Sequence, residues 1–150
     1  MLRDARGATG IGYEGQTLEA VIAELKLSSV TTLFDVRLNA ISRKRGFSKT
    51  ALAAGLRDAG IGYVHLPSLG NPRDNRDGYA IPHTAEGVGA RDAFRDLLRS
   101  AGSEEAIERI AEAARSSRVA VLCFEADQTR CHREQVLDAV NHRLGALVSI

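Results

Sequence analysis

The feature that most constrains the fold is an apolar run from Val119 to Phe124, which has charged residues before and after it. A run of this length and composition is typical of a strand that is buried on both faces. Such strands occur in parallel sheets that are covered by helices on both sides. The chain is therefore predicted to build its core around this strand.

A helix is predicted after this strand and a short polar turn, beginning near Arg130 or Cys131. Its buried stripe consists of four apolar residues, Val136, Leu137, Val140 and Leu144. This start places Cys131, His132 and Arg133 in the first helical turn, just beyond the carboxyl end of the strand. In open α/β sheets ligands bind at this edge, and the free backbone N–H groups of a helix start favour anions.

Three more strands alternate with amphipathic helical patterns along the chain. They are predicted within residues 8–15, which end in a glycine-rich turn, at 29–36 and at 61–66. The fold class is therefore predicted to be α/β, with a mainly parallel sheet of four to five strands and helices on both faces. The tail, residues 145–150, is the candidate for a fifth strand at the sheet edge.

Residues 1–150 are predicted to form a single domain, with residues 1–7 as a poorly ordered N-terminal extension. A long segment at residues 67–89 holds all three prolines and is predicted to be a functional or mobile loop. The start of the chain lacks an apolar targeting segment, and no apolar run approaches transmembrane length. Two cysteines form no disulfide framework, so a reducing, cytoplasmic setting without membrane attachment is expected.

Five sequence motifs then resemble the DUF488 family of bacterial and archaeal proteins, in this order and spacing: GIGYEGQTLE, LFDVR, SRKRGFSK, LRDAGIGYVHLPSLGNP and LCFEADQTRCHRE. The resemblance extends from about Thr9 to the C-terminus. It implies an α/β domain and important positions, but no reaction, because the function of the family is not established. The family usually has a proline shortly before its Ser-Arg pair, whereas this chain has Ala40 and Ile41 before Ser42.

Polar and reactive residues follow each predicted strand, and parallel strands bring their carboxyl ends to one edge of the sheet. The candidate catalytic residues are Cys131, His132, Glu125 and Asp35. The candidate ligand-binding residues are Gly12, Tyr13, Arg37, Ser42, Arg43, His65, Gly70 and Arg133. Since guanidinium groups bind phosphate bidentately, the expected ligand is a small anionic, phosphate-bearing molecule.

Each of these assignments has an alternative. Cys131 is either a nucleophile whose pKa is lowered by the helix start and nearby cations, or a small side chain that only packs. Neither the Cys-x5-Arg loop of phosphatases nor the active loop of rhodaneses follows the cysteines. The arginines either hold an anion or pair with Asp35 and Glu125 in a structural network. No metal is predicted, because a site would need Cys123, Cys131, His132 and His65 to converge, and the spacing is not that of a zinc knuckle.

A binding module is the alternative to an enzyme. Residues 37–49 contain five basic residues and no acidic residue, which suits a nucleic-acid backbone or a partner protein. A third hypothesis is a regulatory domain that responds to oxidation through Cys131. Cofactor, substrate, reaction and oligomeric state are not indicated by the sequence.

Overall fold

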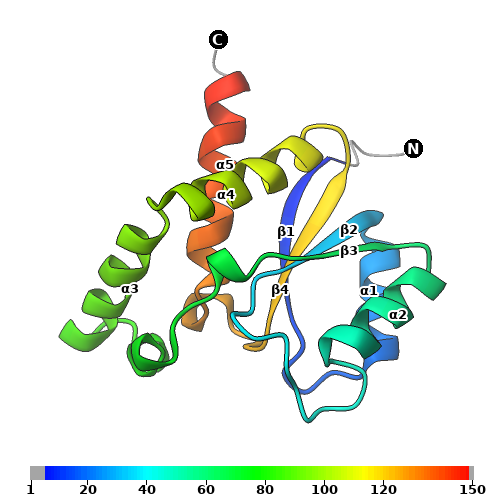
Figure 1. Cartoon of the computed structure of the whole chain (residues 1–150), viewed down its shortest axis with the longest axis horizontal. Coiled ribbons are helices and arrows are strands. Elements are labelled where there is room, and N and C mark those ends of the chain that lie inside the picture. The colour runs from blue at the N-terminus through cyan, green and yellow to red at the C-terminus, as the bar shows by residue number, and fades with distance from the viewer. Residues whose placement is uncertain (1–5, 149–150) are drawn as a thin grey trace.

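The computed structural model describes residues 6–148 and shows one α/β domain (Figure 1). Its sheet has four strands, β1 (Gly7–Gly12), β2 (Val30–Asp35), β3 (Gly62–His65) and β4 (Arg118–Cys123). All neighbouring strands are parallel, in the order β1-β4-β2-β3. The predicted fold class is therefore confirmed, with the apolar run of β4 at the centre of the sheet.

Helices cover both faces of this sheet, as the sequence predicts. Helices α1 (Leu18–Leu27) and α2 (Lys49–Asp58) lie on one face, and α4 (Ala101–Ala114) and α5 (Arg133–Val148) lie on the other (Figure 1). Helix α3 (Ala85–Leu97) lies on the same side of the sheet as α4 and α5, and its buried residues join their core cluster. Among the described residues, none of the helices has the length and apolar composition to span a bilayer.

Side-chain alternation along the strands divides the core into two clusters, one on each face of the sheet. On β4, Val121 and Cys123 point into the cluster beneath α4 and α5, whereas Leu122 points into the cluster beneath α1 and α2. On β2, Phe34 joins the α4–α5 cluster. Asp35, the next residue, therefore points to the opposite face from Cys123.

The register of the strands brings Gly12, Cys123, Asp35 and His65 to one edge of the sheet. Gly12 pairs with Cys123, and Asp35 pairs with both Leu122 and His65. The carboxyl ends of all four strands thus meet at this edge, where the sequence places the functional residues.

The start of α5 differs from the prediction. A short 3₁₀ helix, η4 (Gln128–Arg130), follows β4, and the side chain of Asp127 caps it by accepting from the N–H of Thr129 at 3.0 Å. Cys131 is then extended, with φ −136° and ψ 144°, so the α-helix begins only at Arg133. Cys131 and His132 therefore lie in the connection before the helix rather than in its first turn.

The two ends of the chain also refine the prediction. Helix α5 continues to Val148, so residues 145–148 are helical and form no fifth strand. Residues 149–150 lie outside the described residues, as do residues 1–5 of the predicted extension, while Gly7 already belongs to β1. Residues 67–89 are not one irregular loop, since they contain the 3₁₀ helices η1 (Pro67–Leu69), η2 (Arg73–Asn75) and η3 (Asp77–Ala80) and the start of α3.

Candidate functional site

A closed network of polar side chains surrounds the carboxyl end of β2. Arg37 donates from Nε to Asp35 Oδ1 at 2.8 Å and from Nη2 to Asp35 Oδ2 at 2.6 Å. Its Nη1 donates to the carbonyl of Phe47 at 2.6 Å and to the hydroxyl of Tyr13 at 3.2 Å. The hydroxyl of Tyr63 completes the network by donating to Asp35 Oδ2 at 2.6 Å.

This network pairs the charges of Asp35 and Arg37 with each other. Asp35 and Arg37 are both buried. Burial alone would lower the pKa of Arg37, but the hydrogen bonds and charge of Asp35 raise it above its ordinary value. Burial and the bond to Asp35 likewise raise the pKa of Tyr63. Of the two predicted roles for Arg37, the structural pair with Asp35 is the one that this geometry shows.

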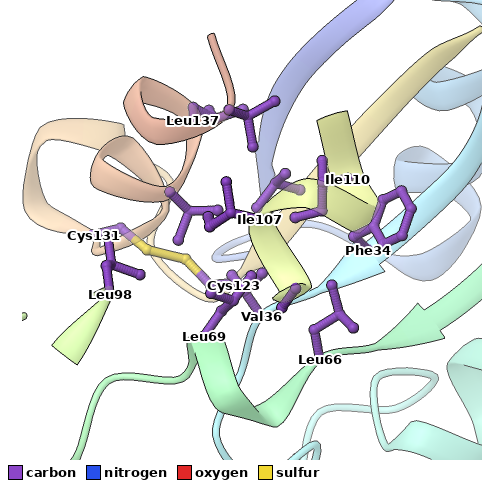
Figure 2. Close-up of a cluster of buried hydrophobic side chains, with 14 of the residues drawn as sticks. Phe34, Val36, Leu66, Leu69, Leu98, Ile107, Ile110, Cys123, Cys131 and Leu137 are labelled. Carbon is purple, nitrogen blue, oxygen red and sulfur yellow. A yellow bond between two sulfur atoms is a disulfide. The ribbon is translucent and has the colours of Figure 1, made fainter. Parts of the chain in front are cut away.

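The second polar cluster lies at the carboxyl end of β4, on the other face of the sheet. Cys123 and Cys131 are joined by a disulfide, which Figure 2 shows at the edge of the α4–α5 core cluster. The expectation of two unpaired cysteines is therefore wrong for this structure. Both cysteines are only 2% exposed and belong to the core cluster beneath α4 and α5. Both also line the cavity at this edge of the sheet.

His132 is held directly beside this pair. Its Nε2 lies 2.9 Å from the carbonyl oxygen of Val36, and its Nδ1 lies 3.8 Å from Cys131 Sγ. Since a carbonyl only accepts, Nε2 carries the hydrogen and Nδ1 presents its lone pair to the sulfur. Burial lowers the pKa of His132 to about 4, so the imidazole is neutral at pH 7.

Arg133 organises the connection between β4 and α5. Its Nη1 donates to the carbonyl of Glu125 at 2.6 Å and to Cys123 Sγ at 3.2 Å, and its Nη2 donates to the carbonyl of Ala126 at 3.2 Å. The side chain is buried, and burial lowers its pKa. Its guanidinium is thus committed to the turn, and its backbone N–H lies 3.5 Å from Cys131 Sγ.

Two of the predicted glycines allow backbone segments to approach closely at this edge. A Cβ on Gly12 would lie 1.8 Å from the carbonyl oxygen of Glu125, and one on Gly70 would lie 2.3 Å from Cα of Leu38. Side chains at these positions would push the surrounding turns apart. Gly12 and Gly70 therefore shape the surroundings of the site, and neither is among the residues that line its cavity.

A cavity of about 280 Å³ opens at this edge of the sheet. Five predicted residues line it, namely Tyr13, Arg37, Glu125, Cys131 and His132. The structure thus brings together residues from the ends of β1, β2 and β4, as predicted from the parallel topology. Of the remaining predicted residues, Gly12, Asp35, Gly70 and Arg133 build its surroundings.

Three predicted residues take other positions. Ser42 accepts from the N–H of Lys44 at 3.1 Å. Arg43 is exposed on residues 37–49, which are called the basic loop below. His65 Nε2 lies 2.7 Å from the carbonyl oxygen of Arg37. None of the three lines the cavity described above.

The cavity also contains residues that were not predicted. Arg76 and Tyr79 reach it from the 67–89 segment, and Phe124 and Arg130 reach it from the β4–α5 connection. The concentration of prolines and glycines in residues 67–89 was the signal for a functional segment. It could not indicate which of its side chains face the cavity.

The fold and this edge define a class of protein: a parallel α/β domain with a cysteine-containing cavity at the carboxyl ends of its strands. Within that class, the chain belongs to the DUF488 family, whose sequence model, described as a domain of unknown function, matches residues 17–140. No curated protein and no solved structure matches the chain. The resemblance seen in the motifs is therefore confirmed at the level of the family.

Proposed function

We propose that the cavity binds a small molecule with an anionic, phosphate-like group, and that Cys131, His132 and Glu125 are the reactive groups facing it. The observation that carries this proposal is the convergence of charged, aromatic and sulfur-containing side chains from several strand ends on one cavity. Ligands of α/β sheets occupy this position.

Arg76 is the best placed partner for the anion. Its Nε donates to the carbonyl of Asn71 at 3.0 Å, which orients the guanidinium, while its terminal nitrogens have no partner among the described residues. Arg130 adds a second cation, with its Nε 3.6 Å from Asp127 Oδ2. Arg37 and Arg133 each already donate four side-chain hydrogen bonds to the protein, so they support the cavity rather than hold the anion.

The cavity wall also favours a ligand with an apolar portion. Ile41 and Phe124 line it although they are 79% and 45% exposed, respectively. Phe124 packs edge-on against Tyr13, whose ring stacks on Phe47 at 4.4 Å between centroids. An aromatic or aliphatic group attached to the anion would cover these side chains and remove apolar surface from water.

The reactive groups need the reduced form of the protein. In the disulfide Cys131 has no thiol, but once reduced its Sγ lies between the Nδ1 lone pair of His132 and the backbone N–H of Arg133. The Nδ1 lone pair of His132 accepts a hydrogen bond from the thiol, and the N–H donor of Arg133 stabilises the thiolate. The carboxylate of Glu125, whose Oε1 lies 3.9 Å from Cys123 Sγ, provides a proton acceptor in the same wall.

The test is titration calorimetry with phenyl phosphate, which combines the anion with an aromatic ring, and with inorganic phosphate. Phenyl phosphate should bind more tightly than phosphate. Arg76→Ala should weaken binding about tenfold or more, because a charge-assisted hydrogen bond is lost. After reduction, bound phenyl phosphate should also slow the alkylation of Cys131 by iodoacetamide.

The matched control is Arg43→Ala, which removes an exposed guanidinium outside the cavity. It should leave the affinity unchanged. If Arg43→Ala weakens binding and Arg76→Ala does not, the anion sits on the basic loop. No binding of either compound would reject the proposal.

The basic loop supports a second candidate, the binding of a nucleic-acid backbone. Arg43, Arg45 and Lys49 are exposed, and none of them makes an ion pair within the described residues. Binding of a fluorescent DNA or RNA oligonucleotide should weaken steeply as salt rises, because counterions are released on binding. Absence of binding at low salt would reject this candidate.

A further inference from the structure

The Cys123–Cys131 pair has a third partner that a simple packing disulfide does not need. The two Sγ atoms and a ring nitrogen of His132 all lie within 4.8 Å of one another. Neighbouring ligand atoms around a tetrahedral zinc ion are about 3.6–3.8 Å apart, as follows from the zinc–ligand bond lengths. The 3.8 Å between Cys131 Sγ and His132 Nδ1 already has this spacing.

The surroundings of these three side chains suit metal ligands. The bond from His132 Nε2 to the carbonyl of Val36 fixes the ring so that Nδ1 faces the sulfurs, which is how proteins orient a ligating histidine. Cys123 Sγ accepts from Arg133 Nη1 at 3.2 Å, and Cys131 Sγ faces the N–H of Arg133 at 3.5 Å. Both donors stabilise thiolates, the form in which cysteine binds metal.

The fourth position of such a site faces the cavity. Glu125 lines the cavity beside both cysteines, and its Oε1 lies 3.9 Å from Cys123 Sγ. A carboxylate oxygen or a water molecule can therefore complete four-coordination from the open side. Two thiolates and an imidazole select a thiophilic divalent ion such as Zn²⁺ over Mg²⁺ or Ca²⁺.

We infer that the reduced chain binds one Zn²⁺ through Cys123, Cys131 and His132, and that oxidation of the two thiolates to the disulfide releases it. The structure shows the oxidised form of this switch, in which the two sulfurs are joined. Metal binding requires no anion in the cavity, so this inference does not depend on the proposed anionic ligand.

Hydrogen peroxide can serve as the oxidant that forms the disulfide. The two thiolates give up two electrons and form the S–S bond, while the O–O bond of the peroxide accepts these electrons. Together with two protons the peroxide leaves as two water molecules, and Zn²⁺ leaves as the hydrated ion. A thiol reductant reverses the step by restoring both thiolates.

The test uses Co²⁺ as a spectroscopic substitute for Zn²⁺ on the whole chain, reduced under anaerobic conditions. The reduced protein should bind one Co²⁺ per chain and show thiolate-to-cobalt charge transfer with the intense visible bands of a tetrahedral site. Zn²⁺ should displace the cobalt and abolish these bands. Peroxide should release the metal to a chelating dye, in parallel with the loss of two hydrogens by mass spectrometry.

Variants separate this site from its surroundings. Cys123→Ser, Cys131→Ser and His132→Gln should each lose the charge-transfer spectrum or weaken binding at least tenfold, with circular dichroism reporting whether each variant is folded. The matched control His142→Gln removes an exposed imidazole of α5 and should bind as the wild type does.

The wild-type measurements decide the outcome even if a variant fails to fold. A reduced wild-type chain that binds no Co²⁺, or whose bound cobalt lacks thiolate charge transfer, would overturn the site. Cobalt binding that survives in folded cysteine variants would place the metal elsewhere and would also overturn it. Metal that stays bound after the disulfide has formed would refute the switch.

Discussion

The carboxyl ends of β2 and β4 carry similar polar residues but use them differently. At β2, Asp35 and Arg37 pair their charges, and Tyr13, Tyr63 and the Phe47 carbonyl add further hydrogen bonds. At β4, the cysteine pair and His132 face a cavity, and the partner of His132 Nδ1 within the described part of the chain is the sulfur of Cys131.

The difference follows from the side-chain alternation of the strands. Asp35 points to the α1–α2 face, where loop residues close over it, whereas Cys123 points to the α4–α5 face beside the opening. A buried charged pair held by several hydrogen bonds is a structural element. A side chain that lines a cavity and keeps free hydrogen-bonding capacity is a candidate for chemistry. Substitutions at the carboxyl end of β2 should therefore affect stability, whereas those at the end of β4 should affect binding and reactivity.

The largest expected effect is at β2. Asp35→Ala should lower the free energy of unfolding by about 3–5 kcal/mol, because it leaves the Arg37 guanidinium buried without its counter-charge. Chemical denaturation of the wild type and the variant measures this difference in the free energy of unfolding. The control is Asp92→Ala, which removes a partner of the exposed Arg95 and should change stability little. A small effect of Asp35→Ala would mean that the β2 network is not the structural element described here.

The next effect concerns the packing of β1 against the end of β4. Gly12→Ala should cost about 3 kcal/mol, because the added Cβ would collide with the Glu125 carbonyl rather than with a flexible side chain. Gly89→Ala in α3 is the matched control, since its Cβ would meet no atom within 4 Å. It should stabilise the chain by up to about 1 kcal/mol through helix propensity. Equal melting temperatures for the two variants would contradict the close approach at Gly12.

The smallest effect is a pH dependence on the cavity side. Burial raises the pKa of Tyr79 from 10.0 to about 12, although the charges of Arg91 and Arg95 oppose the shift. The unfolded chain therefore loses the phenol proton near pH 10 and the folded chain only near pH 12. Stability should fall across this interval by about 1–2 kcal/mol.

Tyr79→Phe isolates this contribution, because it removes the titrating hydroxyl that donates to Gln135 Oε1. The difference in stability between wild type and variant should be constant below pH 10 and should shrink as the pH rises to 12. A difference that stays constant throughout would show that the hydroxyl titrates normally in the folded chain.

Much of the fold was predictable because its signals are local. The apolar run of β4, the β-branched strand β2 and the stripe Val136, Leu137 and Val140 of α5 each follow from periodicity within a single segment. The error at the start of α5 arose because two structures compete there. Asp127 caps a 3₁₀ turn first, and the extended Cys131 delays the α-helix.

The location of the site was predictable from the sequence, but the full set of residues that line it was not. Parallel topology alone brings the segments after β1, β2 and β4 to one edge, so Tyr13, Glu125, Cys131 and His132 were expected to converge. Arg76 and Tyr79 were missed because their placement depends on how the 67–89 segment folds back through three short 3₁₀ helices. The pairing of Cys123 with Cys131 was missed because their spacing matches no known motif.

The sequence by itself determined the class of fold, the family and the edge of the sheet at which polar residues gather, since each depends on patterns within short segments. Only the tertiary structure decided which of these residues are satisfied by the protein and which face a cavity. That distinction depends on contacts between residues far apart in the chain, such as His132 with Val36 and Arg37 with Tyr13. Hydrogen-bonding groups of the same kind become structural or reactive according to these distant partners.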